Sequence, residues 1–157
     1  MVMIIRHAVE ADAVDLAMAL RVEDRAEVLA LLGPVDPVAG PAGSMLHGLA
    51  TACEAWTACD HAGQIICMAG VSPLSLVGVT GVPWLLGSDL VRRHRRAFLT
   101  ESRRLVARWL TWFDALRNVV DARYTAAIRW LRWLGFEIGP VFSLRHGRFH
   151  RVSKETT

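Results

Sequence analysis

The chain has 157 residues, a length that suits one domain with a substantial buried core. Hydrophobic residues make up 53% of it and charged residues only 21%, with six tryptophans, and this composition excludes a disordered chain. Charge is divided unevenly: residues 1–90 carry three basic and ten acidic side chains, a charge of −7, whereas residues 91–157 carry fifteen and five, a charge of +10, which together give the net +3.

The first third of the chain predicts a strand, then helices separated by a proline-rich loop. Apolar residues recur every three or four positions after Asp12, as in an amphipathic helix. Residues 33–43 contain three prolines and are predicted to be a loop, neither helix nor central strand. The predicted elements are a strand at 3–6, helices at 13–20 and 23–32, and a short helix at 44–50.

The middle of the chain predicts three strands. The turn at residues 60–63 joins the first two as a hairpin. Residues 65–86 hold no charged side chain, but glycines and prolines interrupt them, so we expect strands with turns rather than a membrane-spanning helix. The predicted strands are 53–59, 64–71 and 79–86.

The last third alternates helices and strands. Asp121 is predicted to cap the N-terminus of the last helix, and Gly135 to end it. The predicted helices are 95–113 and 122–134, and the predicted strands 116–120, 136–138, 141–145 and 149–152. A strand meander followed by a strand–helix–strand unit predicts an α/β fold over residues 1–157, with a mixed, mostly antiparallel central sheet and helices on both faces.

The N-terminal residues do not have the pattern of a secretory signal. Three cysteines, Cys53, Cys59 and Cys67, have no metal-ligand spacing, and no histidine completes a zinc site, so no metal is expected. The six histidines are scattered along the chain, and no hydrolase motif accompanies them.

Two segments, residues 4–17 and 118–136, resemble the first strand and helix and the second conserved block of the GCN5-related N-acetyltransferase (GNAT) family. The resemblance implies a coenzyme A pyrophosphate held by the helix that follows the fourth strand, where family members carry a glycine-rich loop. No glycine follows Gly87 in that segment here. The position of the family's proton-donating tyrosine falls on Leu131, which cannot donate a proton. These departures predict no catalytic residue and no cofactor.

A second resemblance covers roughly residues 80–138 and rests on the stretches 83–89, 98–103 and 118–136. They are similar to a small set of internal virion or assembly proteins of T7-like short-tailed phages that have a degenerate acetyltransferase-like fold. This resemblance implies a place in the virion, and in the host cytoplasm before assembly. The implied partners are other phage virion proteins, including copies of the chain itself in a ring; neither nucleic acid nor membrane is expected.

The arginine cluster Arg92, Arg93, Arg95 and Arg96 is the first candidate interface. It suits phosphate, nucleic acid or an acidic protein surface, or it is a solvated first turn of a helix. Nucleic acid is the weaker reading, because no aromatic residue is interleaved and the other half of the chain is acidic.

The outward face of the helix at 122–134 is the second candidate interface. It is expected to carry Arg129, Trp130 and Trp133, a composition typical of interface hot spots. The alternatives are that the C-terminal segment covers these tryptophans or that Arg129 stacks on Trp133 in solvent. Tyr124, the only tyrosine, is expected in the core.

The leading prediction is therefore a non-catalytic phage virion or assembly component that acts through protein–protein contacts. The alternative is an atypical acetyl-CoA-dependent N-acetyltransferase, and a nucleic-acid-binding adaptor comes third. The cleft between the fourth and fifth strands distinguishes the first two predictions. It should be open in an enzyme and filled by side chains in a non-catalytic protein.

Overall fold

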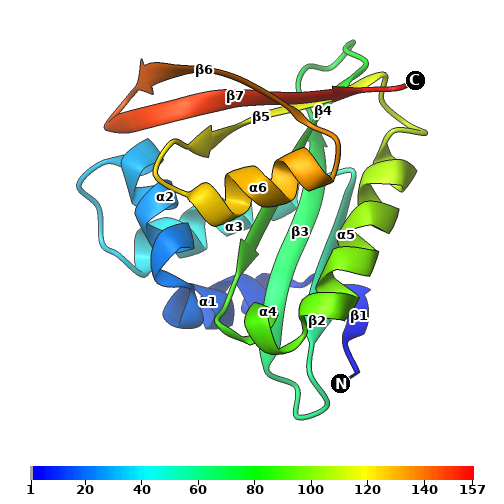
Figure 1. Ribbon diagram of the computed structural model, residues 1–157. Coiled ribbons are helices and arrows are strands. Elements are labelled where there is room, and N and C mark those ends of the chain that lie inside the picture. The colour runs from blue at the N-terminus through cyan, green and yellow to red at the C-terminus, as the bar shows by residue number, and fades with distance from the viewer. Residues whose placement is uncertain (1) are drawn as a thin grey trace.

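A seven-stranded mixed sheet forms the centre of the computed structural model, which describes residues 2–157 (Figure 1). The strand order is β1-β2-β3-β4-β5-β7-β6, and only the β4–β5 pair is parallel. The predicted fold class is confirmed. The strands are β1 Ile4–His7, β2 Glu54–Cys59, β3 Ile65–Pro73, β4 Thr80–Gly87, β5 Ala115–Asp121, β6 Glu137–Leu144 and β7 Gly147–Glu155.

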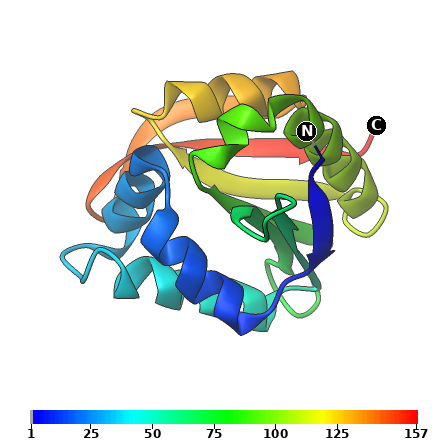
Figure 2. The same cartoon turned by 90° about the horizontal axis from the view of Figure 1, so that it is seen from below.

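Helices cover both faces of the sheet, as Figures 1 and 2 show. On one face Leu16 of α1 and Met45 of α3 pack against Met68 of β3. On the other, Val106 of α5 packs with Val71 of β3. Because both faces are covered, β3 is buried almost throughout. The helices are α1 Glu10–Ala19, α2 Val22–Leu32 and α3 Ala39–Thr51 on the first face, and α4 Leu90–Arg93, α5 Arg95–Trp109 and α6 Thr125–Trp133 on the second.

The prediction of a loop over residues 33–43 is wrong in its second part, because α3 already begins at Ala39. The Asp36 carboxylate accepts hydrogen bonds from the N–H groups of Val38 (2.9 Å) and Ala39 (2.7 Å) and so starts the helix. Pro41 lies in the first turn, where its missing N–H is not needed by the helix.

The helix predicted from Ala122 begins three residues later, and Asp121 is the last residue of β5 rather than a helix cap. Its carboxylate accepts hydrogen bonds from the backbone N–H of Arg123 (2.9 Å) and from its side chain (2.7 Å to Nη2). The predicted stop is confirmed: Gly135 follows α6 with a φ of 94°, which favours glycine.

The uncharged stretch at residues 65–86 forms β3, β4 and the loop between them, as predicted. No helix within residues 2–157 combines the length and the hydropathy that crossing a membrane requires. Over the same residues, no group of three or more metal-ligating side chains is close enough to hold an ion.

Candidate functional site

The central feature of the molecule is a gap between β4 and β5. The two strands pair only through Thr80 with Ala115 and Gly81 with Leu116, and then diverge (Figure 1). Their divergence opens a cleft of about 780 Å³ that residues of α2, α4, α5 and α6 also line. This volume is within the range of small-molecule sites. The cleft is open rather than filled by side chains.

Asn118 stabilises the point where the strands separate. Its Nδ2 donates to the Pro83 carbonyl of β4 (2.6 Å), and its Oδ1 accepts from the N–H of Val119 in β5 (2.7 Å). One side chain thus replaces the next rung of the parallel ladder and satisfies backbone groups that the divergence would leave unpaired. We refer to this arrangement as the Asn118 bridge.

The register of β4 directs backbone groups into the cleft. The N–H of Ser88 donates to the Ile66 carbonyl (2.9 Å), so the even-numbered residues of β4 bond β3. Backbone groups of Pro83, Leu85 and Gly87 therefore face the other way, toward β5. Pro83 has no N–H and its carbonyl belongs to the Asn118 bridge. The N–H and C=O of Leu85 are left facing the open part of the cleft.

Helix α2 spans the carboxyl ends of the two diverging strands. Asp24 Oδ2 accepts from the N–H of Gly87 at the end of β4 (2.7 Å). One turn later, Glu27 Oε2 accepts from the N–H of Asp121 at the end of β5 (2.8 Å). The two carboxylates of one helix thus hold the ends of both strands at a fixed separation.

The carboxylates on α2 differ in their charge partners. Arg21 donates to Asp24 from Nε (3.1 Å) and Nη2 (2.8 Å), and this buried ion pair compensates Asp24. No arginine, lysine or histidine within residues 2–157 lies at salt-bridge distance from Glu27. Burial raises the pKa of Glu27 to about 7, and the nearby carboxylates of Asp24 and Asp121 contribute.

Tyr124 lines the cleft and is not a core residue, contrary to the prediction. It precedes α6 and lies beside the Arg21 guanidinium, which is 6.0 Å from the ring centre. Burial raises the pKa of its phenol above the usual range, and the charge of Asp24 adds to this. The hydroxyl therefore stays protonated and able to donate a hydrogen bond.

The predicted arginine cluster divides between the cleft and the solvent. All four arginines are exposed, but only Arg92 of α4 and Arg95 of α5 line the cleft. Arg129 of α6, from the second predicted set, joins the cleft wall. The cleft therefore has three cationic side chains along its α4–α6 wall. That any of these five arginines belongs to a protein–protein interface stays a prediction.

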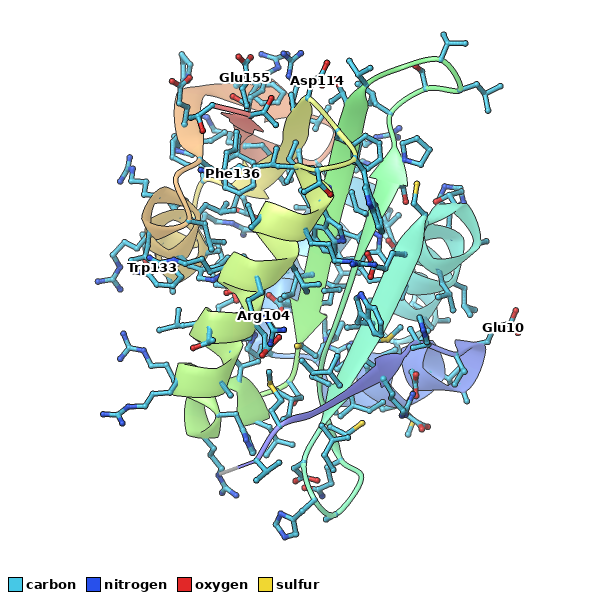
Figure 3. The ribbon with its side chains drawn as sticks, turned by 90° about the vertical axis from the view of Figure 1, so that its right-hand side faces the viewer. Glu10, Arg104, Asp114, Trp133, Phe136 and Glu155 are labelled. Atoms are coloured by element: carbon cyan, nitrogen blue, oxygen red, sulfur yellow. The ribbon has the colours of Figure 1, made fainter. Side chains whose placement is uncertain are left out.

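The two predicted tryptophans also line the cleft, with different exposure. Trp130 does not face outward as expected: α6 lies beside α5, so its ring packs on Phe98 (5.4 Å between centres) and its Nε1 donates to Ser102 (3.3 Å). Trp133 is 43% exposed on the outer side of α6 (Figure 3). Its stacking partner is Arg103 at 3.9 Å, not Arg129. Their part in an interface stays a prediction.

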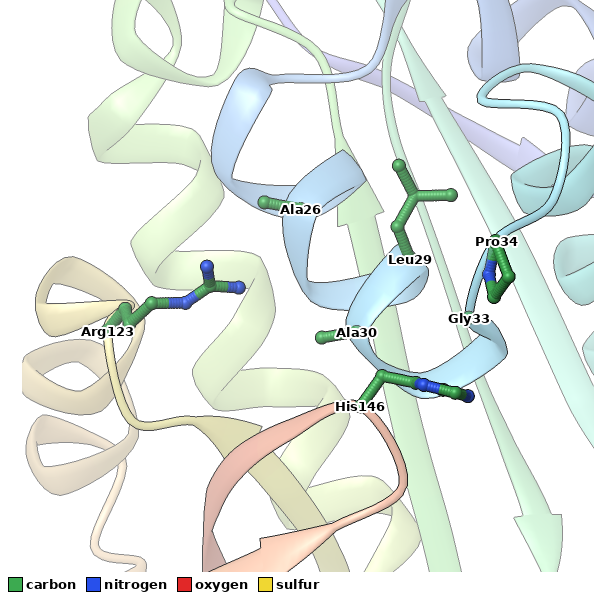
Figure 4. Close-up of a pocket in the computed structure, with 7 residues that line it drawn as sticks. All are labelled: Ala26, Leu29, Ala30, Gly33, Pro34, Arg123 and His146. Carbon is green, nitrogen blue, oxygen red and sulfur yellow. The ribbon is translucent and has the colours of Figure 1, made fainter.

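A second, shallower hollow of about 380 Å³ lies between the end of α2 and the β6–β7 turn (Figure 4). Ala26, Ala30 and Gly33 form one wall, with His146 opposite. Its one arginine, Arg123, is paired with the Asp121 carboxylate. This hollow offers few free polar groups, so the larger cleft is the candidate site.

Comparison with solved structures identifies the fold. The chain is similar to a GNAT superfamily phosphinothricin acetyltransferase from Sinorhizobium meliloti in complex with acetyl-CoA (18% identity, 99% of this chain and 89% of that chain covered, TM-score 0.68). It is also similar to a GCN5-related N-acetyltransferase from Kribbella flavida (16%, 98% and 98%, 0.68) and to a spermidine N-acetyltransferase chimera from Vibrio cholerae (11%, 98% and 95%, 0.67). No protein-family model and no curated protein sequence matches the chain. The chain has the GNAT fold.

The prediction of a non-catalytic phage virion or assembly component is contradicted. The GNAT structures that the chain resembles are named as acetyltransferases, and they support the alternative prediction. The implied similarity to phage proteins finds no support among them. The missing glycine-rich loop and the leucine at position 131 are local departures, whereas the cleft of this chain is opened by the divergence of β4 and β5.

Sequence reasoning missed Glu27, Asp24 and Arg21. In the sequence they are ordinary charged positions on a surface helix. The GNAT fold places them against strand ends that lie 63 and 94 positions further along the chain. In β5, Asn118 was noticed only as part of the resemblance to the second conserved block.

Proposed function

We propose that the chain is an acetyl-CoA-dependent N-acetyltransferase with an atypical coenzyme pocket. The open cleft between β4 and β5 is the observation that carries the proposal. A chain that had kept only the scaffold would have no need for an empty space of about 780 Å³ with directed polar groups. The acetyl-CoA complex of the similar Sinorhizobium meliloti protein supports the same ligand.

The polar groups of the cleft suit the parts of coenzyme A. Arg92, Arg95 and Arg129 offer guanidinium groups for phosphates, in place of the missing glycine-rich loop. The first-turn N–H groups of α5 lack intrahelical acceptors and add to this positive field. The N–H and C=O of Leu85 suit the amides of an extended pantetheine arm. When bound, acetyl-CoA supplies an activated acetyl group as a thioester.

Leu131 stands at the position where the GNAT resemblance implies a tyrosine, so that position cannot supply a phenol. Tyr124 lines the cleft and supplies one instead. Its raised pKa keeps the proton on the oxygen, so Tyr124 donates a hydrogen bond to the sulfur as negative charge develops there. The Asn118 bridge keeps the strands apart, so that the thioester and the acceptor nitrogen meet between them.

Acetyl-CoA binding to the wild-type protein tests the proposal. At a concentration one hundred times the dissociation constant, the ligand adds about 2.7 kcal/mol to the free energy of unfolding. For a chain of this length that corresponds to a rise in Tm of about 5–10 °C. Release of free thiol in the presence of an amine would then establish transfer. An unchanged Tm with millimolar acetyl-CoA, together with no heat of binding, would contradict the proposal.

A further inference from the structure

Glu27 differs from every other carboxylate at the carboxyl ends of β4 and β5. Asp24 is compensated by Arg21, and Asp121 by Arg123 at 2.7 Å. Glu27 lines the same cleft and has one hydrogen bond, from the backbone N–H of Asp121. Ionising a half-buried carboxylate that has no cation beside it is costly, and such a group in a cleft is a candidate for a functional role that a cationic ligand would suit.

The cations near Glu27 are already engaged. Arg21 is held by two hydrogen bonds to Asp24, and Arg123 by two to Asp121. The other arginines that line the cleft, Arg92, Arg95 and Arg129, belong to α4, α5 and α6, and none of them lies at salt-bridge distance from Glu27, although Arg92 approaches Glu23 at 3.8 Å. The α2 wall is thus negative, and within residues 2–157 no guanidinium lies at salt-bridge distance from Glu27 to receive an anionic group of a substrate.

Resting on the proposed function, we infer that Glu27 binds the acceptor and is its general base, and that the acceptor is a cationic alkyl primary amine without an anionic group beside the nitrogen. The ammonium ion supplies the charge that Glu27 lacks. A phosphinothricin-like acceptor, which carries carboxylate and phosphinate, would find no free cation on the α2 wall.

The proton balance of the step is as follows. Glu27, directly or through one water, takes a proton from the ammonium group, and the freed nitrogen lone pair attacks the thioester carbonyl carbon. A C–N bond forms, the C–S bond breaks, and sulfur leaves with the bonding electron pair. The second nitrogen proton ends on the sulfur and the first passes from Glu27 to solvent. One amide, one free thiol and one proton result for each ammonium ion and acetyl-CoA consumed.

The charged and titratable groups facing Glu27 support a base that works near neutral pH. Asp24 from the same helix and Asp121 from β5 raise its pKa, whereas Arg21 lowers it, and burial is the largest cause. The ionised form of Glu27 therefore predominates only above about pH 7. The rate should rise with pH through this value.

The inference is tested with Glu27→Gln, Glu27→Asp and the control Glu10→Gln, which changes an exposed glutamate at the start of α1. Thiol release is measured from pH 5.5 to 9 with acetyl-CoA and either 1,4-diaminobutane or phosphinothricin. We expect kcat/KM for the diamine to fall about 10²- to 10⁴-fold in Glu27→Gln, the inflection near pH 7 to disappear, and Glu27→Asp to recover part of the loss. Glu10→Gln should match the wild type.

Two independent measurements separate a failure of this inference from a failure of the proposed function. Acetyl-CoA affinity, measured by calorimetry, should be equal in wild type and Glu27→Gln; no binding to the wild type overturns the proposed function itself. Because the pKa of Glu27 is raised from 4.5 to about 7 by folding, its carboxyl group destabilises the folded state increasingly between these two pH values and fully above pH 7, so Glu27→Gln should raise Tm more at pH 8 than at pH 5. If the wild type binds acetyl-CoA, three results overturn the inference alone. They are full activity of Glu27→Gln, a higher kcat/KM for phosphinothricin than for the diamine, and no acetylation of the diamine.

Discussion

Exchanging the arginines that line the cleft should weaken acetyl-CoA binding, whereas exchanging their neighbours should not. Arg92 and Arg95 line the cleft, whereas Arg93 and Arg96 belong to the same exposed segment but do not line it. The double variants Arg92→Gln/Arg95→Gln and Arg93→Gln/Arg96→Gln remove the same net charge. Only the first removes groups that can reach a bound phosphate.

The magnitude follows from the exposure of these side chains. A hydrogen bond to a charged group contributes about 1.5–3 kcal/mol when well shielded. The side chain of Arg92 is 75% exposed, so about 1 kcal/mol for each arginine is the appropriate figure. The pair then contributes about 2 kcal/mol, a roughly thirty-fold rise in Kd. The exposed 3.8 Å contact of Arg92 with Glu23 adds little to stability, so the fold should persist.

Calorimetric titration with acetyl-CoA at 50 mM and 500 mM salt is the assay. The wild type and the control double variant should bind alike, and both should lose affinity at high salt because exposed charges are screened. The variant of the cleft arginines should bind about thirty-fold more weakly and depend less on salt. Equal weakening by both variants would show that only the overall charge matters, and no weakening by either would refute phosphate binding by these arginines.

Three further predictions concern the cleft and its support. Tyr124→Phe should lower kcat about ten- to one-hundred-fold and leave the Kd for acetyl-CoA within two-fold, measured by thiol release and calorimetry; an unchanged kcat would exclude the phenol from the reaction. Asn118→Ala leaves two backbone groups unpaired at the cleft apex, which costs about 1–3 kcal/mol and lowers Tm by several degrees in a thermal melt; an unchanged Tm would mean that water replaces the bridge. Burial alone would raise the pKa of Asp12, but hydrogen bonds from Arg6 and other groups hold it at about 2, below the unfolded value near 4. The ionised Asp12 should therefore contribute about 2 kcal/mol to the free energy of unfolding above pH 4, and this contribution should be lost as pH falls toward 2. Asp12→Asn should abolish this pH dependence in acid denaturation.

The order of strands and helices was predictable because local patterns determine it. The hairpin at residues 60–63 and the stop at Gly135 depend on turn residues that act over a few positions. The sequence predicts too short a helix α3, because proline breaks a helix interior, whereas Pro41 lies in a first turn that tolerates it. Asp121 has the side chain of an N-cap, but it ends β5 and bonds Arg123 instead.

The candidate site was less predictable because it is assembled by tertiary contacts. The arginine cluster was noticed as a charge run, but which of its members face the cleft depends on the break at His94 between α4 and α5. Glu27 gave no signal, because its burial arises from contact with a strand end 94 positions away. The functional prediction failed for a related reason: the missing glycines and tyrosine are local features, whereas the opening of the cleft is a property of the sheet.

Titration of the isotope-labelled protein with acetyl-CoA, followed by amide chemical shifts, tests the central claim most directly. Binding in the β4–β5 cleft predicts large shifts for the amide of Leu85 and for the first turn of α5, beginning at Arg95. Amides beside the second hollow, such as those of Ala30 and His146, should stay in place. Shifts confined to that hollow, or none at millimolar ligand, would contradict the claim that this cleft binds acetyl-CoA.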